Sequence, residues 1–417
     1  MLDFYVARAI ANTETQRHRK FLLLASILSN LSVLGFFKYY DFFAGSTNSL
    51  ISILGGSPTT LPFLNLILPI GISFYTFQSM CYVIDVYHRT SDAHANLLSF
   101  AGYVTLFPHQ ISGPLVRHNT IVPQLEAAAT YVFQAENFWR GCYFFIIGLA
   151  KKMMIADLLA AAVDPLIHDM ASASNLEAIL AMFGYTFQLY FDFSGYSDMA
   201  VGLGLMMNIQ FPQNFNSPYK SKSITEFWQR WHISLSAWLR DYLYISMGGN
   251  KEGKYKTYRN LLLTMVIGGL WHGANWTYIL WGLFHGLILV IEKFFKGRLK
   301  AANNRMRSAT GFVITFVLIN LGWVLFRSAN FQVAALWLKK VFLLNSEITW
   351  TLFHIATKHK DRFFLALVVG GLIAFFGKNT WQFELKPNLK NALILAFLFS
   401  ICLMYMGDES PFLYFQF

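Results

Sequence analysis

Charge is the most informative shortage in this 417-residue chain, because only 13% of its residues are Asp, Glu, Lys or Arg. Soluble domains carry roughly 25% charged residues, so this chain has too few to cover a water-exposed surface. Hydrophobic residues make up 55% and aromatic residues 17% of the sequence, and the mean hydropathy is +0.42. This composition excludes a collagen, a coiled coil and a disordered chain, and it indicates an integral membrane protein.

Cysteine is also scarce. The three cysteines, Cys81, Cys142 and Cys402, lie far apart within apolar runs, and none belongs to a CxxC pair. This spacing excludes a disulfide scaffold and a thiolate metal site. We therefore expect small buried thiols and no bound metal.

Acidic residues are outnumbered by basic ones, 22 against 33, which gives a formal net charge of +11. A positive balance can indicate nucleic-acid binding, but here the basic residues form short runs between apolar segments. That arrangement is typical of cytoplasmic loops. The expected partner is thus the lipid bilayer and not a nucleic acid.

Apolar segments recur along the whole chain, and several are shorter than the roughly 20 residues that a lipid span needs. Short segments that carry Gly, Pro, Asp or His favour re-entrant or broken helices that line a cavity inside the protein. We expect an all-α polytopic membrane protein with about eight to eleven crossings, plus re-entrant and interfacial helices around a central funnel or tunnel. The segments lie near residues 21–37, 62–84, 97–107, 138–150, 153–167, 176–193, 199–210, 260–271, 276–292, 309–326, 363–377 and 391–406.

The basic clusters predict the topology, because such clusters face the cytoplasm. They lie at residues 8–20, 88–89, 151–152, 251–259, 293–307 and 339–340, whereas residues 46–60 carry no charge. The first apolar segment is then an anchor, preceded by a basic cytoplasmic stretch at 1–20. Clusters also bracket 260–292, which predicts a pair of helices that enters and returns, with residues 271–276 at the turn.

No internal repeat, low-complexity stretch or Pro/Ser-rich linker interrupts the sequence. We therefore expect residues 1–417 to form a single membrane-embedded domain, with the motif-bearing core at 190–290.

Residues 223–244 predict one helix. Ser223 and Glu226, three residues apart at its start, fit a capping box in which each side chain bonds to the backbone N–H of the other. Trp228, Trp231, Leu235, Trp238 and Tyr242 form an aromatic and apolar stripe, and Gln229, His232, Ser236 and Arg240 share another. On periodicity alone, an interfacial amphipathic helix is favoured over a site.

His272 lies in GGLWHGANW, where small residues permit close backbone approach and Trp271 and Trp276 add bulk. Burial disfavours a charged imidazole, so His272 is expected to be neutral at pH 7 and able to act as a general base. The alternative is a histidine that only bonds one helix to another; for an ionisable residue inside the membrane, function is favoured. His285, on a regular helix, is favoured as structural.

Two carboxylates, Asp192 and Asp198, lie in the apolar run FDFSGYSD around Gly195. They could form a proton relay or an ion site, or they could pair with arginine or cap the halves of a helix broken at Gly195; the structural interpretation is favoured. Arg117 ends a predicted re-entrant turn, FPHQISGPLVRH, and could pair with a carboxylate or hold an anionic substrate.

Several common catalytic motifs are missing. The sequence contains no GxxxxGK[ST], no HExxH and no GxSxG, and no GxGxxG between a strand and a helix. A nucleotide-binding fold, a zinc peptidase and an α/β-hydrolase are therefore unsupported.

Taken in order, these motifs resemble the membrane-bound O-acyltransferase family, in particular its bacterial branch of alginate O-acetylation, with teichoic acid D-alanyl transfer as a close relative. The resemblance runs from about residue 21 to the C-terminus, and members of this branch usually begin with further hydrophobic segments. The matching stretches are GFFKYYDFF at 35–43, LPIGISFYTFQ at 68–78, ISGPLVRH at 111–118, YFDFSGYSDMAVG at 190–202, FPQNFNSPYKSKSITEFWQRWHISLSAWLRDYLYI at 211–245, WHGANWTYILWGLFHG at 271–286, GWVLFR at 322–327 and SPFLYFQF at 410–417.

The resemblance implies acyl transfer from a cytoplasmic thioester, acetyl-coenzyme A or another acyl or carrier thioester, for decoration of an extracytoplasmic polysaccharide. It places the protein in the bacterial inner membrane with an extracytoplasmic acetylating partner protein and no tightly bound cofactor. The family's catalytic histidine falls on His272 and its second polar position on His232. Further candidates for substrate or donor binding are Arg117, Trp271, Asn275, Ser236 and Arg240.

Coenzyme A phosphates would be attracted by Lys251, Lys254, Lys256 and Arg259, although positive-inside topology explains this cluster more simply. Two rival functions remain at this point: a transporter or channel, whose path would be lined by Asp192, Asp198 and His272, and a non-catalytic scaffold of a polysaccharide export complex.

Overall fold

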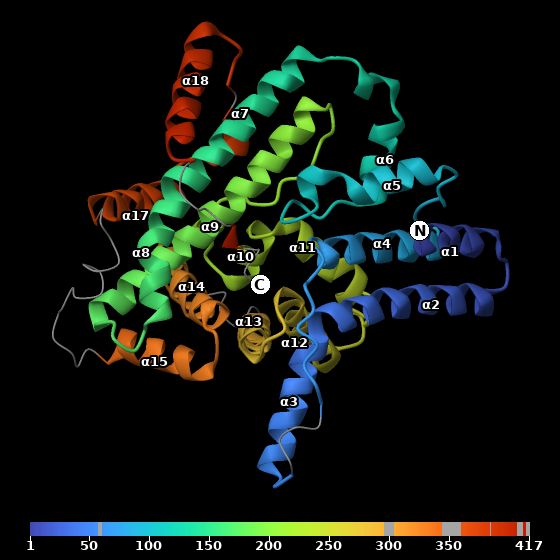
Figure 1. Cartoon of the computed structure of the whole chain (residues 1–417), viewed down its shortest axis with the longest axis horizontal. Helices are drawn as coiled ribbons and strands as arrows, with labels where there is room; N and C mark the ends of the chain where they lie inside the picture. Colours follow the sequence, from blue (N-terminus) through green and yellow to red (C-terminus); the bar gives the residue numbers. More distant parts are fainter. Residues whose placement is uncertain (57–60, 296–303, 344–359, 384, 407–411, 414–417) are drawn as a thin grey trace. The chain divides into compact units, whose positions relative to one another are not determined.

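The computed structural model describes residues 1–56, 61–295, 304–343, 360–383, 385–406 and 412–413. Every regular element in these ranges is helical, and they contain no strand (Figure 1). The chain divides into two compact units, Met1–Phe133 with Asn208–Gln210, and Gln134–Met207 with Phe211–Phe417. The predicted all-α membrane fold is confirmed, whereas a single domain stays a prediction.

The first unit is built on one long apolar helix. Helix α2 (Gln16–Leu34) continues through a π-helical turn, η1 (Gly35–Tyr39), into α3 (Tyr40–Ile53), so that Gln16–Ile53 forms 38 helical residues without a break. The buried Arg19 donates to the carbonyl oxygens of Ile10 and Tyr87, and thereby ties the ends of two other helices to α2. The remaining elements are α1 (Leu2–Asn12), α4 (Ile72–Tyr87), α5 (Leu97–Thr105), η2 (Phe107–His109), α6 (His118–Glu126) and η3 (Ala128–Tyr131).

The second unit carries the motif-bearing core. Its elements are α7 (Ala135–Lys151), η4 (Lys152–Ala156), α8 (Asp157–His168), α9 (Asn175–Met206), η5 (Pro218–Lys220), α10 (Ile224–Arg230), α11 (Ile233–Trp238), η6 (Leu239–Tyr244), α12 (Lys254–His272), α13 (Trp276–Phe295), α14 (Asn304–Arg327), α15 (Phe331–Phe342), α17 (Lys360–Phe375), η7 (Thr380–Gln382) and α18 (Leu389–Met404).

Helix α9 is continuous over 32 residues, so the predicted helix break at Gly195 is wrong. The helix starts at a capping box in which the Ser174 side chain and Glu177 exchange hydrogen bonds with each other's backbone N–H groups. Gly195 serves packing instead, since a Cβ added there would lie 2.7 Å from the carbonyl oxygen of Gly148 on α7. Glycines at such a crossing let two helices approach closely, and α7 and α9 lie side by side in Figure 1.

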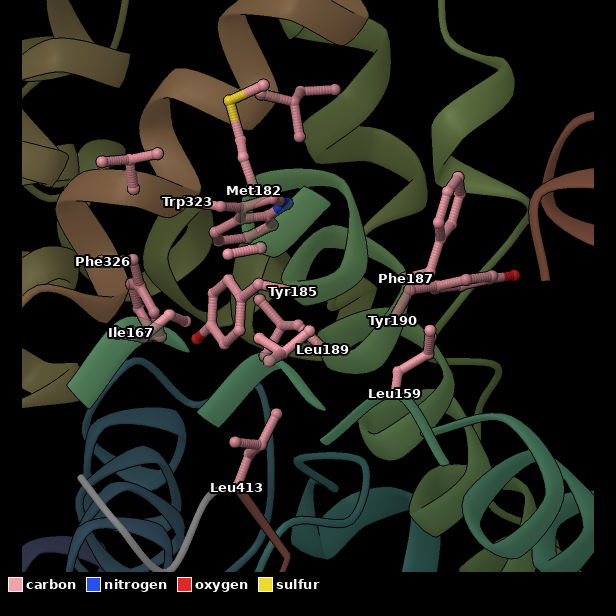
Figure 2. Close-up of a cluster of buried hydrophobic side chains, with 14 of the residues drawn as sticks. Leu159, Ile167, Met182, Tyr185, Phe187, Leu189, Tyr190, Trp323, Phe326 and Leu413 are labelled. Atoms are coloured by element: carbon pink, nitrogen blue, oxygen red, sulfur yellow. The ribbon is translucent and has the colours of Figure 1, made fainter. Parts of the chain in front are cut away.

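Aromatic side chains fill the core of the second unit. Figure 2 shows Trp323 and Phe326 of α14 beside Tyr185 of α9, within one cluster of buried hydrophobic residues. One polar chain links the buried rings: the Trp323 indole donates to Tyr219 Oη, which donates to the Thr186 carbonyl oxygen. Tyr185 Oη, by contrast, has no hydrogen-bond partner among the described residues. Buried aromatic rings contribute large apolar areas at fixed geometry, so this cluster makes a rigid base for the neighbouring short helices.

Three helices in the described ranges are long and apolar enough to cross a bilayer: Gln16–Ile53, Trp276–Phe295 and Ser308–Arg327. The shorter α18 is also apolar. In the predicted segment 62–84, only the part from Ile72 onward is helical. The predicted count of eight to eleven crossings stays a prediction. Residues 57–60 of the uncharged stretch, 296–303 of a basic cluster and most of the terminal SPFLYFQF lie outside the described residues.

Candidate active site

The single helix predicted over 223–244 is wrong, because the chain breaks at His232. Helix α10 ends at Arg230, His232 takes a left-handed conformation with φ of +43°, and α11 starts at Ile233. The loop before α10 stabilises this break: Asn216 N donates to Arg230 O, and Ile233 N donates to Asn214 O, each at 2.9 Å. The break moves His232 off the polar stripe on which Gln229, Ser236 and Arg240 were placed.

The predicted cap is only half formed. Ser223 Oγ accepts the Glu226 N–H at 3.0 Å, as expected. The Glu226 carboxylate instead accepts the Lys222 N–H and pairs with Arg230, and does not return to the Ser223 backbone.

The aromatic stripe of this segment packs inside the protein, whereas Gln229 and Arg240 on the polar stripe are exposed. Trp231, Leu235 and Trp238 are each less than one tenth exposed. The Trp231 ring lies 4.9 Å from Trp323 and 5.0 Å from Phe215, between centroids. The aromatic periodicity that suggested a membrane surface therefore reflects core packing.

His232 is held by a specific hydrogen bond. Its Nδ1 lies 3.1 Å from Asn214 Oδ1, which also accepts from the backbone N and the hydroxyl of Ser234. A backbone N–H can only donate, so the facing Asn214 atom is the oxygen and His232 Nδ1 carries the proton. In the neutral ring, Nε2 then bears the lone pair and can accept a hydrogen bond or a proton.

The second ring nitrogen of His232, Nε2, is buried and has no hydrogen-bond partner among the residues that the structure describes. His232 lies outside the helices long enough to span a bilayer, and burial lowers the pKa of its imidazole to about 3. The ring is therefore neutral at pH 7. Other buried histidine nitrogens, such as His285 Nδ1, also lack a described partner. What Nε2 of His232 offers is an acceptor of known tautomer, which can take a hydrogen bond from a ligand hydroxyl.

His272 is the last residue of α12, directly before the Gly273–Asn275 turn that leads into α13. This confirms the predicted helical pair. The imidazole is buried among rings, with centroids 5.3 Å from Trp281 and 5.2 Å from Phe326. The Trp271 ring lies 5.0 Å from His272 and 6.4 Å from His232, so one indole contacts both histidines. The structure thus brings His232, Trp271 and His272 together.

His285 lies on the regular part of α13 and is as deeply buried as His232. Trp281 and Trp228 pack against its ring at 5.1 and 5.3 Å. A Cβ added to Gly322 of α14 would approach His285 Nε2 to 2.6 Å. The imidazole thus fills the space between two helices, which supports the structural interpretation.

Both aspartates of α9 form ion pairs with lysines and not with arginine. Asp192 lies 2.6 Å from Lys152 Nζ and also accepts the Leu413 N–H. Asp198 lies 2.5 Å from Lys151 Nζ and accepts from the Thr380 hydroxyl. With their charges paired, these carboxylates support the structural interpretation over a proton relay.

The other candidates are more peripheral. Ser236 Oγ donates to the Trp231 carbonyl oxygen, and Arg240 is exposed and pairs with Asp241. Asn275 accepts the Thr277 N–H and donates to Ala329 O, so it stabilises the start of α13. Arg117 belongs to the first unit, directly before α6. Substrate contacts for these four residues stay predictions.

Asn214, which orients His232, was not identified as a site residue from the sequence. It lies in the quoted motif FPQNFNSPY, but an asparagine in a loop gives no signal that it will reach a histidine 18 residues later. In the described ranges, no group of three or more His, Cys, Asp and Glu side chains could hold a metal ion.

A cavity of about 820 Å³ lies at the opposite end of the α12–α13 pair from His272. Its lining includes Lys222, Gln229, Leu289 and Glu292. The Glu292 carboxylate accepts the backbone N–H groups of Ile224 and Thr225, so it fixes the start of α10 at the cavity wall. Such volumes are typical of small-molecule sites.

The basic residues at the start of α12 lie at this same end of the helical pair. Lys254 and His272 are the first and last residues of α12, which puts about 27 Å between them at 1.5 Å per residue. A ligand held by this cluster must therefore extend along most of the pair to reach the histidines.

Comparisons with known proteins assign the family. Residues 90–334 match the membrane-bound O-acyltransferase family. The chain belongs to this family. It is 46% identical to the probable alginate O-acetylase AlgI of Pseudomonas aeruginosa, over 90% of the chain and 70% of the relative. It is 35% identical to the peptidoglycan O-acetyltransferase of Helicobacter pylori, over 100% of the chain and 86% of the relative.

A more distant relative is the teichoic acid D-alanyltransferase of Bacillus subtilis, 31% identical over 64% of the chain and 71% of the relative. The resemblance drawn from the motifs is confirmed. The protein is a membrane O-acyltransferase, and this membership argues against the transporter and scaffold alternatives.

Proposed function

We propose that this protein takes an acetyl group from acetyl-coenzyme A on the cytoplasmic side of a bacterial inner membrane and directs it to a hydroxyl of an extracytoplasmic polysaccharide such as alginate. The names of the relatives support acetyl transfer to alginate or peptidoglycan. The structural observation that carries the proposal is the buried Nε2 of His232 without a described partner, beside the Trp271 indole that also contacts His272.

His272 acts as the general base. It takes the proton of the acceptor hydroxyl as the oxygen forms a bond to the thioester carbonyl carbon, and the C–S bond then breaks. The proton on the imidazolium passes to the departing thiolate, which leaves as a thiol. Base catalysis of this kind contributes about 10² to 10⁴ in rate.

His232 holds the acceptor. Its fixed tautomer leaves Nε2 able to accept but not donate a hydrogen bond, and its low pKa opposes protonation. This argues against donation to the thioester carbonyl. His232 can accept a hydrogen bond from the acceptor while His272 deprotonates the hydroxyl that receives the acetyl group.

The donor enters through the cavity near Lys222 and Glu292. Lys222 and Lys293 supply positive charge in its lining, and coenzyme A carries several phosphates that such charge attracts. The rings of Trp228, His285 and Trp281 are packed against one another between this cavity and His272, so the acetyl end of the donor must pass beside them and not through them. The basic residues Lys251, Lys254, Lys256 and Arg259 serve topology first and attract the donor second.

An extracytoplasmic partner protein completes the reaction, because a membrane-embedded site cannot by itself follow a secreted polymer. The test uses the purified full-length protein in lipid nanodiscs with acetyl-coenzyme A labelled on the acetyl group. We expect slow donor hydrolysis by the protein alone and transfer to polymer once the partner is added. Transfer to long polymer at full rate without a partner contradicts the relay, and absence of any donor turnover with the partner present contradicts the proposed function.

A further inference from the structure

A second cavity, of about 620 Å³, lies away from the histidines, between α17, the connection that follows it and the helices from α7 to α8. Its walls are apolar for most of their length, with Ile147, Met154 and Leu158 on one side and Leu365, Val369 and Ile373 on α17. The apolar walls offer water few polar partners.

The outer face of α17 indicates what surrounds this cavity. Val368, Leu372 and Phe376 are more than half exposed, although they are apolar. In a membrane protein such a face contacts hydrocarbon. The cavity-lining residues Leu365 and Val369 are themselves partly exposed on the same helix, so the cavity is continuous with the lipid-facing surface.

The cavity lining contains a cation near each end of α17. Arg362, near the start of the helix, contacts the Tyr405 ring at 5.9 Å. Lys378, just beyond the end of the helix, is exposed and makes a cation–π contact with Phe383 at 5.8 Å. Among the described residues Lys378 forms no ion pair. Thr380 and Lys151 lie at the same end, but Lys151 already neutralises Asp198. Lys378 is therefore a cation free to meet an anionic head group.

We propose that this cavity is a binding site for an anionic phospholipid of the bilayer, with one acyl chain along α17 and the phosphate at Lys378. Helix α17 has 16 residues and is thus about 24 Å long, which gives room for an acyl chain. The apolar walls take the chain and the lysine selects the charge. This lipid site is separate from the acetyl-transfer site.

The test compares lipid binding by the full-length protein, purified in detergent and titrated with phosphatidylglycerol or phosphatidylcholine of the same chain length, with bound lipid counted by native mass spectrometry. Val369→Trp fills the cavity, and Val368→Trp adds the same bulk one residue away on the exposed face. We expect Val369→Trp to lose the retained lipid and Val368→Trp to keep it. Equal retention by the two variants overturns the site.

Charge selection is tested separately. Phosphatidylglycerol should bind about fivefold more tightly than phosphatidylcholine, as expected for one lysine near a membrane surface. Lys378→Gln should abolish that preference, whereas Lys386→Gln in the same loop should preserve it. A wild-type protein without a preference, or a Lys378→Gln variant that keeps it, contradicts the assignment of the head group.

Discussion

His232 and His285 are both buried among aromatic rings, yet their backbone positions and hydrogen-bond partners differ. His232 lies at a break between two short helices, where Asn214 fixes its tautomer and leaves Nε2 without a described partner. His285 lies in the middle of α13 and packs tightly against Gly322, and although its Nδ1 also lacks a described partner, no residue like Asn214 is shown to fix its tautomer. Burial and aromatic neighbours therefore do not distinguish a catalytic histidine from a packing one. The backbone position and the orienting partner do.

The largest effect is expected at His272, which shares Trp271 with His232. His272→Ala should lower acetyl transfer by about 10² to 10⁴ because the base is removed, while the melting temperature changes little. His285→Ala should do the reverse, with lower yield and stability but near-normal turnover per folded molecule. Both variants are assayed after matching for monodispersity. Near-normal turnover in His272→Ala contradicts the assignment of the base.

Next in size is the effect of the residue that orients His232. Asn214→Ala removes the acceptor of a buried N–H, a loss of about 1–3 kcal/mol, so turnover should fall by about 5- to 150-fold. Ser234→Ala removes only one of the other donors to Asn214 and is the milder control. Equal turnover in Asn214→Ala and the wild type argues against a fixed tautomer.

The same contact predicts a change in pH dependence. The low pKa of His232, about 3, keeps it neutral throughout pH 5–8. Asn214→Asp places a negative charge beside Nδ1, which favours the protonated imidazole and raises that pKa. Activity of the variant should therefore fall as the pH is lowered, at a pH where the wild type is still active. Turnover measured from pH 5 to 8 checks this, and coincident profiles contradict it.

The sequence predicted the helices well where apolar runs end at clear signals. Residues 260–292 were predicted as a helical pair because basic clusters bracket two apolar runs, and α12 and α13 agree. Gly195 was misread because a glycine that breaks a helix and one that packs against another helix look alike in a sequence. Only the partner, Gly148 on α7, distinguishes the two.

The break at His232 could not be predicted, because residues 223–244 have an unbroken helical periodicity. It depends on two hydrogen bonds from the loop at Asn214 and Asn216, which are tertiary contacts. The family resemblance singled out both histidines, whose roles stay predictions, and the structure places both beside the Trp271 indole. The tautomer of His232, which decides what it can do, required the position of Asn214.

A smaller effect, on the melting temperature, is expected when the packing around His285 is changed. Gly322→Ala would put a methyl group 2.6 Å from His285 Nε2, and overpacking of this kind costs about 1–3 kcal/mol. The variant should melt at a lower temperature without losing turnover per folded molecule. Gly371→Ala, whose methyl group would meet Phe187 at an ordinary 3.6 Å, is the matched control. Equal melting temperatures contradict a tight fit of His285.

The last prediction concerns the orientation of the α12–α13 pair in the membrane, because donor access from the cytoplasm depends on it. The substitutions that test it are expected to change activity least. Residues 251–259 are predicted to face the cytoplasm, and the 271–276 turn the opposite side. Tyr255 and Trp276 are 90% and 51% exposed at the two ends of the α12–α13 pair. Tyr255→Cys is a better probe than a cysteine at Gly253, whose φ of +91° disfavours any side chain.

In whole cells a membrane-impermeant thiol reagent should label Trp276→Cys and leave Tyr255→Cys unlabelled until the cells are permeabilised. A background without Cys81, Cys142 and Cys402 removes the native thiols from the readout. Labelling of Tyr255→Cys from outside would show that the α12–α13 pair has the opposite orientation in the membrane. His272 would then lie near the cytoplasmic surface and the donor cavity near Lys222 would open to the wrong side for coenzyme A, so the route of the donor would have to be abandoned while the roles of the two histidines could still stand.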